Sequence, residues 1–265
     1  MKSDCNQLLC CVYLIDSAIC VTNPFPDMNL QPILLIPEKK DVEFEQVAAA
    51  WTNKGGQIKR PGKYWIKDEQ LANYPIAIYG GQAFALVLAQ IYNLQLVSPD
   101  DTLITLLENK WTKRDIQLSQ IMNITESDLP AFVKPVVPKM FLAGIFNTLT
   151  DFHEITQGLE ANEAILISTI VPDITAEARS FVLDGIIKDI ALYEGSADTA
   201  AAIDFLTNFL QYNKHQLPRV VVIDLAYSEH TGWFVLEFNA CWGAGLNNCS
   251  SDKVIDCIIA ATDQN

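Results

Sequence analysis

Hydrophobic and polar positions alternate in blocks after residue 31, and these blocks predict strands and helices in turn. Short apolar runs bounded by Pro or Gly indicate buried strands, whereas apolar residues spaced i, i+3, i+4 and i+7 indicate amphipathic helices. The pattern predicts strands at 32–37, 76–79 and 94–97, a helix from Asp41 to Gly55, and a helix across 84–91. Asp41 is expected to cap the first helix. This βαβ order predicts a small parallel sheet.

After residue 100 the pattern changes to shorter helices and more strands. It predicts helical stretches at 103–107 and 113–122, strands at 132–137, 164–171 and 179–185, a helix at 199–212, and a hairpin of 219–226 with 233–240. The hairpin is expected because two apolar runs flank a polar turn. We therefore predict an α/β domain at 28–100 and an α+β domain at 101–265, preceded by a poorly ordered leader at 1–27.

Charge excludes some classes of partner. Half of the 265 residues are apolar and 19% are charged, which is an ordinary globular composition. The 18 Lys and Arg residues stand against 32 Asp and Glu residues, so the formal net charge is -14. Nucleic acids and anionic membrane surfaces both require clustered basic residues. We therefore expect neither a nucleic-acid nor a membrane partner, although a few basic groups or a divalent cation can still bind a small anion.

The cysteines and the first residues bear on the cellular location. Seven cysteines without a CxxC pair indicate no zinc ribbon, redox dithiol or disulfide framework, so we expect a cytoplasmic protein. Lys2 followed by an apolar stretch from Leu8 to Val21 is similar to a secretory signal. Asp16 interrupts that stretch, so we favour a leader outside the fold and keep the signal peptide as the alternative.

The final hairpin carries a candidate metal site. In a hairpin without a bulge, paired residue numbers have a constant sum, so Asp224 faces Glu237 and Ala226 faces Val235. Asn239 lies two residues beyond Glu237 and projects from the same face. Like charges opposed across a hairpin destabilise it unless a cation joins them, and oxygen ligands of this kind suit Mg²⁺. A solvated face for both acids is the alternative, and the spacing does not exclude it.

Two lysines precede this hairpin in the chain. Lys134 lies in an apolar strand before Pro135, where burial requires an anionic partner. Lys139 begins a turn that reaches Gly144. The two lysines are candidates for binding nucleotide phosphates, and an edge-strand lysine that reaches solvent is the alternative for Lys134. The chain contains no GxxxxGK[ST] phosphate-binding loop.

Taken together, these motifs resemble the ATP-grasp superfamily and, within it, the R2K clade. The resemblance rests on three motifs in the family's order: FVKP followed by KxFxxG up to Gly144, ExRxFVxxG from Glu177, and Asp224 with EFNxxxGAGL from Glu237. The matching segments lie between Ala131 and Leu246. The resemblance implies an α/β + α+β fold in which a small parallel α/β domain at the N-terminus, on the substrate side, is followed by two α+β subdomains that clamp a nucleotide.

The resemblance also implies roles for individual residues. Lys134 and Lys139 would contact ATP, the strand end at Ser168, Thr169 and Ile170 would form the adenine-side hinge, and Glu177 would lie near the ribose hydroxyls. Asp224, Glu237 and Asn239 would hold one or two Mg²⁺.

Arg179 and Lys139 are the residues that the resemblance places in catalysis. A guanidinium at Arg179 would orient a phosphate or a carboxylate substrate. The alternative for Arg179 is a surface ion pair with Glu177 or Asp184.

The sequence departs from the wider superfamily at two points. Many members carry an arginine two residues before the metal-binding aspartate, where this chain has Val222, and Lys139 or Arg219 are the candidates to supply that charge. The upstream phosphate-binding lysine has no clear motif here, and Lys113 is the candidate.

The resemblance implies an ATP-dependent ligase that joins a small-molecule or peptide carboxylate to an amine, or a similar nucleophile, through an acyl phosphate, with ATP and Mg²⁺. Two alternatives remain. The first is a catalytically silent nucleotide-binding regulatory module, suggested by Val222. The second is an acidic structural or interaction protein in which the hairpin acids are solvated.

Overall fold

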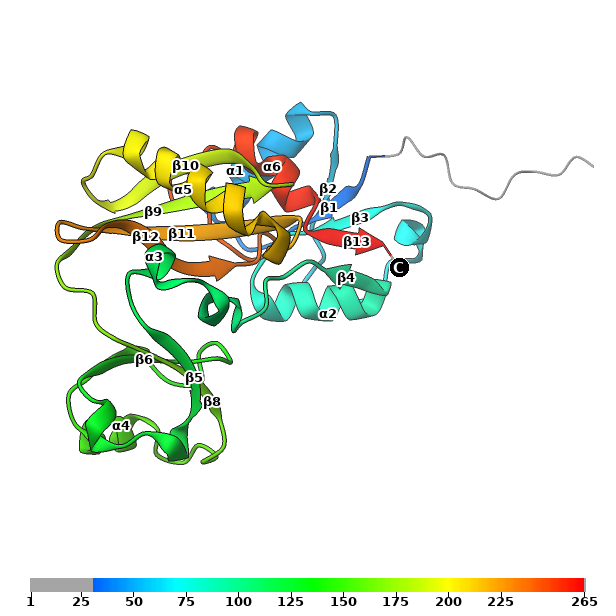
Figure 1. Ribbon diagram of the computed structural model, residues 1–265. Coiled ribbons are helices and arrows are strands. Elements are labelled where there is room, and N and C mark those ends of the chain that lie inside the picture. The colour runs from blue at the N-terminus through cyan, green and yellow to red at the C-terminus, as the bar shows by residue number, and fades with distance from the viewer. Residues whose placement is uncertain (1–30, 265) are drawn as a thin grey trace, which may run out of the picture. The chain divides into compact units, whose positions relative to one another are not determined.

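The computed structural model describes residues 31–264, and the predicted leader at 1–27 lies outside the described residues (Figure 1). A parallel sheet begins the described chain, with strand order β2-β1-β3. Its strands are β1 (Ile33–Leu35), β2 (Gln57–Lys59) and β3 (Ile76–Ile78). β1 and β3 are buried at every position, and β1 pairs in parallel with both β2 and β3, which confirms the predicted parallel sheet. The pattern did not reveal β2, because this edge strand is polar at two of its three positions.

Two helices follow the predicted alternation. They are α1 (Val42–Asn53) and α2 (Gln82–Tyr92), and the Asp41 side chain caps α1 by accepting a hydrogen bond from the Glu43 backbone N–H. The predicted third strand is β4 (Leu94–Leu96), but it does not join the parallel sheet. It pairs antiparallel with β13 (Thr262–Gln264), so the last residues of the described chain lie beside this first part.

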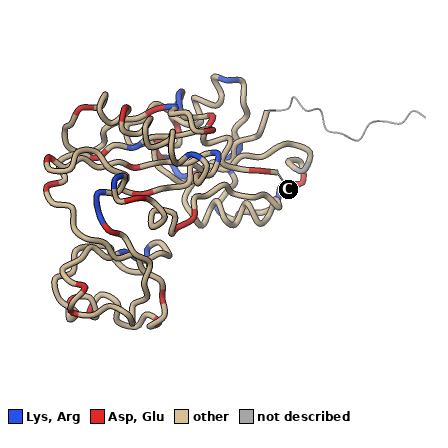
Figure 2. The backbone as a smooth tube through the Cα atoms, viewed as in Figure 1, with Lys and Arg blue, Asp and Glu red and all other residues tan. Residues whose placement is uncertain are grey.

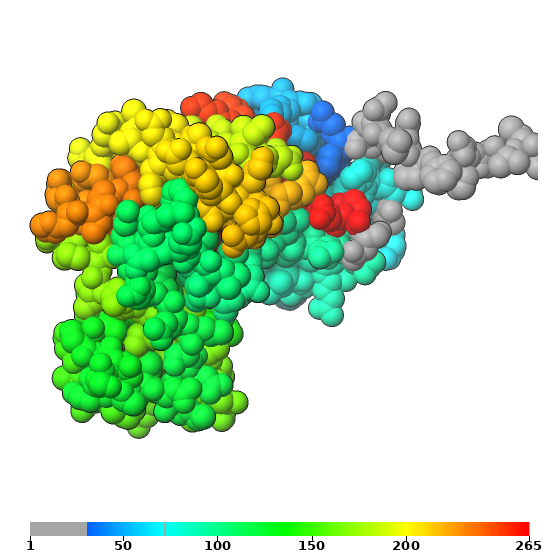
Figure 3. Space-filling view, viewed as in Figure 1, coloured from blue at the N-terminus to red at the C-terminus, as the bar shows by residue number. Residues whose placement is uncertain are grey.

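A small antiparallel sheet has the strand order β5-β8-β6-β7. Its strands are β5 (Ile116–Gln120), β6 (Ala131–Pro135), β7 (Gly144–Phe146) and β8 (Ala164–Ser168). Val133 and Ile165 point to a core that contains Phe152 of α4 (Leu149–Ile155), which leaves the opposite face of the sheet for a site. In the space-filling view, the green residues of this sheet and its loops form one continuous surface (Figure 3).

The predicted helix at 113–122 is wrong, because most of this segment forms β5. Leu118, Ile121 and Met122 have helical spacing in the sequence. Only Ile121 is buried among them, whereas Leu118 and Met122 are exposed. β5 pairs with β8 over its whole length, and this pairing between distant parts of the chain outweighs the local pattern.

A larger antiparallel sheet has the order β10-β9-β11-β12. It comprises β9 (Ile174–Leu183), β10 (Ile186–Gly195), β11 (Val220–Ser228) and β12 (Gly232–Asn239). Helix α5 (Thr199–Asn213), predicted from its pattern, packs against one face, and α6 (Ser251–Ile259), with α1, packs against part of the other. The remaining short helices are α3 (Asn109–Thr112), η1 (Glu69–Asn73), η2 (Leu103–Leu106), η3 (Ile121–Asn123), η4 (Glu126–Asp128) and η5 (Lys214–Gln216).

The final hairpin contains a β-bulge that the sequence analysis did not foresee. Asp224 pairs with Glu237 as predicted, but Leu225 pairs with Val235, so the prediction that Ala226 faces Val235 is wrong. Leu236 is the extra residue. A bulge interrupts the regular alternation of side chains. Val235 therefore packs in the core beneath α5, whereas Glu237 faces the opposite side of the sheet.

Charged positions are interspersed along the backbone, with Lys and Arg in blue among Asp and Glu in red (Figure 2). Within residues 31–264, none of the helices combines the length and the apolar character that a bilayer-spanning segment needs.

Candidate active site

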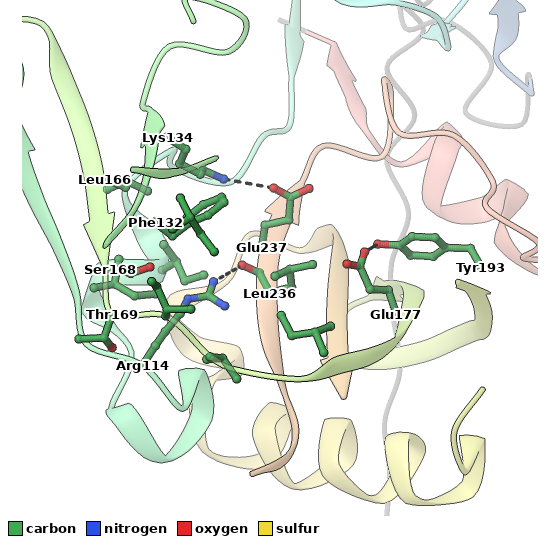
Figure 4. Close-up of a pocket in the computed structure, with 16 residues that line it drawn as sticks. Arg114, Phe132, Lys134, Leu166, Ser168, Thr169, Glu177, Tyr193, Leu236 and Glu237 are labelled. Carbon is green, nitrogen blue, oxygen red and sulfur yellow. Dashed lines mark hydrogen bonds and ion pairs between the residues drawn. The ribbon is translucent and has the colours of Figure 1, made fainter. Parts of the chain in front are cut away.

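Two cavities are lined by residues of both antiparallel sheets, and they meet at Lys134 and Glu237. The first has a volume of about 340 Å³ and is mostly apolar (Figure 4). Its apolar walls include Ile116, Phe132, Leu166, Ile170, Ile174 and Leu236. The second has a volume of about 300 Å³ and a mixed lining that includes Asp100, Asp101, Lys139, Phe141 and Asn239. The junction of an apolar and a charged cavity allows one ligand with an apolar end and an anionic end to occupy both.

Lys134 and Glu237 form an ion pair at this junction. The Lys134 Nζ lies 3.1 Å from Glu237 Oε2, and both side chains are about one-third exposed (Figure 4). Lys134 alternates with the buried Val133 on β6, so its side chain faces the cavities rather than the core. The pair excludes the alternative of an isolated edge-strand lysine that only reaches solvent.

The three oxygen-bearing side chains of the hairpin lie together, as the sequence predicted. The Asn239 Nδ2 donates to Asp224 Oδ2 at 3.0 Å and to Glu237 Oε1 at 3.1 Å. Their exposure differs. Glu237 and Asn239 line the second cavity, whereas Asp224 is 1% exposed and is among the lining residues of neither cavity. Only two of the three side chains therefore face space that a ligand can enter.

Arg179 lies directly opposite Asp224 on β9 and binds it with two hydrogen bonds. Arg179 Nε donates to Asp224 Oδ1 at 2.8 Å and a terminal nitrogen donates to Oδ2 at 2.6 Å, while its other terminal nitrogen donates to the Gly245 carbonyl at 2.9 Å. The surface ion pair with Glu177 or Asp184 is thus wrong. Burial lowers the pKa of Arg179, but the bonds to Asp224 outweigh it and raise the pKa above its ordinary value. Arg179 is therefore a permanent cation.

Val222 is buried on β11, and the cation beside Asp224 comes from Arg179 on the neighbouring strand β9. Arg219, one of the two predicted substitutes, is about half exposed and lies near Asp184 and Asp263 instead. Lys139, the other, has a left-handed backbone (φ 67°) and lines the second cavity with Lys134.

Electrostatics keep Glu237 ionised. Burial would raise its pKa, but Lys134 and the amide of Asn239 outweigh burial and hold the pKa below the ordinary value of 4.5. A carboxylate with a depressed pKa stabilises the fold above its ordinary pKa and loses that contribution as pH falls through the depressed value. The ion pair with Lys134 therefore persists at neutral pH and weakens only below pH 4.5.

The predicted hinge residues line the first cavity. Ser168 ends β8, and Thr169 and Ile170 continue along the wall. The Thr169 backbone N–H donates to the Asp115 carbonyl at 3.0 Å, and its hydroxyl accepts from the Asp115 N–H at 3.1 Å, which fixes the strand end. Glu177 lies on β9 at the same cavity, so the structure brings the predicted hinge and ribose residues to one place.

Arg114, which no sequence motif marked, lies next to the predicted phosphate-binding candidate Lys113. Arg114 lines the first cavity and donates to the Leu236 carbonyl at 2.7 Å, whereas Lys113 is not among the lining residues (Figure 4). Burial lowers the pKa of Arg114 to about 10, which still leaves the side chain charged at neutral pH. Lys113 has a left-handed backbone (φ 53°) at the end of α3, and the chain turns there before Arg114 starts toward β5.

Comparison with known proteins identifies the family. Residues 111–257 match the ATP-grasp domain of the R2K clade, family 2. The fold is similar to a RimK domain ATP-grasp protein from Sphaerobacter thermophilus (TM-score 0.51, 10% identity, 86% of this chain and 99% of that one). It is also similar to D-alanine–D-alanine ligase from Bacillus anthracis complexed with ATP (TM-score 0.56, 12% identity, 88% and 97%).

The ATP-grasp ligase PsnB, complexed with a minimal precursor, is a further structural relative (TM-score 0.54, 12% identity, 86% of this chain and 98% of that one). A search among curated proteins finds no match. At these identities the solved structures show the fold alone, and they confirm the predicted ATP-grasp architecture. Because the family match covers more than half of the sequence, the chain belongs to the R2K clade of ATP-grasp proteins.

Proposed function

We propose that this chain is an ATP-dependent ligase that activates a carboxylate as an acyl phosphate and joins it to an amine or a similar nucleophile. The observation that carries the proposal is the junction of the two cavities at Lys134 and Glu237. The apolar cavity offers stacking surfaces for a base, and the charged cavity offers groups of both signs for phosphates and substrates. The membership of the ATP-grasp family supports the same conclusion.

The first cavity has the size and lining for a nucleoside. In the proposal the base lies among Phe132, Leu166 and Leu236, beside the hinge at Ser168–Ile170. Glu177 faces the ribose. Lys134 lines both cavities, Arg114 lines the first alone and Lys139 lines the second alone, and these three are the cations proposed for the phosphates.

The donor set fits a magnesium ion. Mg²⁺ in nucleotide sites takes one or two carboxylates and completes its shell with phosphate oxygens and water. Glu237 and Asn239 would hold it from the second cavity, with Asp224 behind them in its pair with Arg179. Within residues 31–264 no three His, Cys, Asp or Glu side chains gather for a metal, and Asn239, whose amide nitrogen donates to Glu237, would have to turn its oxygen toward the ion. When bound, the ion neutralises charge on the phosphate oxygens.

The chain's own residues would act mainly by position and charge. A substrate carboxylate oxygen attacks the γ-phosphorus and ADP leaves; the amine nitrogen then attacks the acyl carbon and phosphate leaves. Lys139 is the proposed cation for the transferred group in the second cavity. Arg179 is proposed to act through Asp224 and Asn239, because its guanidinium is already bound on both sides. The substrates are small-molecule or peptide carboxylates and amines.

Hydroxylamine trapping tests the proposed function without knowledge of the amine. The full chain, ATP and Mg²⁺ are incubated with a panel of amino acids and peptides, with hydroxylamine as a general nucleophile. We expect ADP release that depends on one class of carboxylate, together with the matching hydroxamate by mass spectrometry. ADP release without any hydroxamate across carboxylates that stimulate it would contradict an acyl phosphate.

The silent regulatory module predicts a different result, namely calorimetric binding of ATP and Mg²⁺ with no ADP under any condition. Its motivation was the missing arginine at Val222. Arg179 brings a guanidinium to Asp224 from β9, which supports the ligase over the silent module. The buried free thiols of Cys241, Cys249 and Cys257 support the further proposal that the protein works in the reducing cytoplasm.

Arg114→Met is expected to weaken ATP binding by about 10- to 100-fold, because a hydrogen-bonded charge in the first cavity is lost. Lys113→Met removes the same charge one residue earlier, outside the cavity, and is the matched control. Calorimetry with ATP and Mg²⁺ measures both. Equal affinities of the two variants for ATP would contradict the role of Arg114 in phosphate binding, and Lys113 would again be the candidate for that role.

A further inference from the structure

Tyr193 lies at a second β-bulge, opposite Glu177. In the pairing of β10 with β9, Leu192 is opposite Ala178 and Glu194 is opposite Glu177, so Tyr193 is the extra residue. Bulges beside binding sites redirect side chains without breaking the sheet. Tyr193 and Glu194 therefore both lie across from one carboxylate, and the tyrosine is the one that lines the first cavity with Glu177.

The backbone fixes this bulge at Gly195. Its φ of +68° lies in the left-handed region, and a Cβ atom on this residue would lie 1.8 Å from the Thr175 carbonyl oxygen. Only glycine fits so close an approach between the two strands. The position of Tyr193 two residues earlier is thus determined by backbone geometry and not by its side chain alone.

The Tyr193 hydroxyl donates a hydrogen bond to Glu177 Oε2 (Figure 4). Burial and this bond to Glu177 raise the pKa of Tyr193 above its ordinary value, so the hydroxyl keeps its proton and stays a donor. The guanidinium carbon of Arg179 lies 5.9 Å from the centre of the tyrosine ring. Arg179 therefore contacts the tyrosine ring, while the tyrosine hydroxyl binds the Glu177 carboxylate.

A carboxylate that is hydrogen-bonded through one oxygen cannot rotate freely. Its second oxygen remains able to accept a hydrogen bond. In residues 31–264 no hydrogen bond is made to Glu177 Oε1, while Oε2 is taken by Tyr193. Glu177 lines the cavity, so this oxygen is the acceptor that it can offer to a ligand hydroxyl. An ionised acceptor makes hydrogen bonds about twice as strong as a neutral one.

We propose that Tyr193 is a positioning residue that orients Glu177 toward a ribose hydroxyl and thereby makes the site select ribonucleotides over deoxyribonucleotides. This inference rests on the proposed ATP binding and adds the sugar specificity and the residue that determines it. Tyr193 does not itself contact the sugar in this proposal; it acts through Glu177.

Tyr193→Phe is the variant that isolates the hydroxyl. Phenylalanine keeps the ring beside Arg179 and removes only the bond to Glu177. Tyr227→Phe is the matched control, because Tyr227 lies on β11 of the same sheet, packs against Trp233, and is not among the lining residues of either cavity. Glu177→Gln serves as a second variant, which removes the charge that Tyr193 is proposed to orient.

The experiment measures dissociation constants by calorimetry for the full chain with Mg²⁺ and ATP, 2′-deoxy-ATP or 3′-deoxy-ATP. For the wild-type chain we expect about tenfold or greater weakening with at least one deoxy form. In Tyr193→Phe and in Glu177→Gln that ratio should fall below about threefold, whereas Tyr227→Phe should keep the wild-type ratio. Circular dichroism melting of each variant confirms that it is folded.

The outcomes separate this inference from the function on which it rests. A wild-type chain that does not bind ATP would overturn the proposed function and this inference together. ATP binding without discrimination against either deoxy form, or a Tyr193→Phe variant that keeps the wild-type ratio, would overturn the role of Tyr193 and leave ATP binding intact. A folded Tyr193→Phe variant with weaker ATP binding but an unchanged ratio would likewise show a structural role only.

Discussion

Glu237→Gln is expected to lower ATP turnover by about 10²- to 10³-fold while the chain remains folded. Glu237 lines both cavities, pairs with Lys134, and is a proposed oxygen ligand of Mg²⁺. Glutamine keeps the size of the side chain and removes its charge. The fold should tolerate the change because 38% of the side chain is exposed, so solvent screens the lost ion pair. ADP release at saturating ATP and Mg²⁺, with the carboxylate that stimulates the wild-type chain, measures the effect.

The control for this prediction is Glu229→Gln. Glu229 is exposed at the turn of the same hairpin, so the substitution makes the same charge change away from the cavities. A second readout is the rise in melting temperature caused by ADP with Mg²⁺, which Glu237→Gln should reduce and Glu229→Gln should not. If Glu237→Gln turned over ATP at the wild-type rate, the metal assignment and the role of the cavity junction would both be wrong.

The part of the site that depends on local strand geometry could be predicted from the sequence. The pairing of Asp224 with Glu237 followed from hairpin register alone, and the structure confirms it. The bulge at Leu236 could not be predicted, because Val235 and Leu236 are both apolar. No polar residue marks the point at which the alternation of inward and outward side chains is interrupted. Because the bulge was missed, the pairs predicted between Asp224 and the turn were shifted by one residue. The pair of Asp224 and Glu237 was not affected.

Contacts between segments that are distant in the chain could not be predicted from the sequence. Nothing near Arg179 in the chain indicates that its partner is Asp224, since the two meet only after β9 and β11 pair. Likewise, no sequence feature indicates that Arg114 lines the first cavity while its neighbour Lys113 does not, because this depends on how the chain turns after α3.

The strands that were missed share a physical cause. β10 is an edge strand whose residues are mostly half-buried, so its sequence shows no clean alternation. β5 is also an edge strand, and its exposed Leu118 gives a false helical spacing with its neighbours. Strands with two buried faces, such as β1 and β3, were found because apolar residues occupy every position.

Arg179→Met is expected to destabilise the fold by about 3–5 kcal/mol, because it leaves the Asp224 carboxylate buried without its counter-charge. The Arg179 side chain is 11% exposed and that of Asp224 is 1% exposed, so solvent cannot replace the two lost hydrogen bonds. Asn239 would be the remaining donor to Asp224 among the described residues. For a domain of this size we expect a fall in melting temperature on the order of 10 °C. Arg219→Met, at a half-exposed arginine just before β11 of the same sheet, should change stability by less than about 0.5 kcal/mol.

A double variant distinguishes the cause of this loss. If the cost arises from an uncompensated buried charge, Arg179→Met combined with Asp224→Leu should recover most of the stability, because well-packed apolar pairs often replace buried ion pairs without loss. If the ion pair instead stabilises the sheet by direct attraction, the double variant should be no more stable than Arg179→Met. Urea unfolding of the wild-type chain, both single variants and the double variant gives the coupling free energy. A single variant within 1 kcal/mol of the wild type would contradict the structure of the pair, since no other described cation bonds to Asp224.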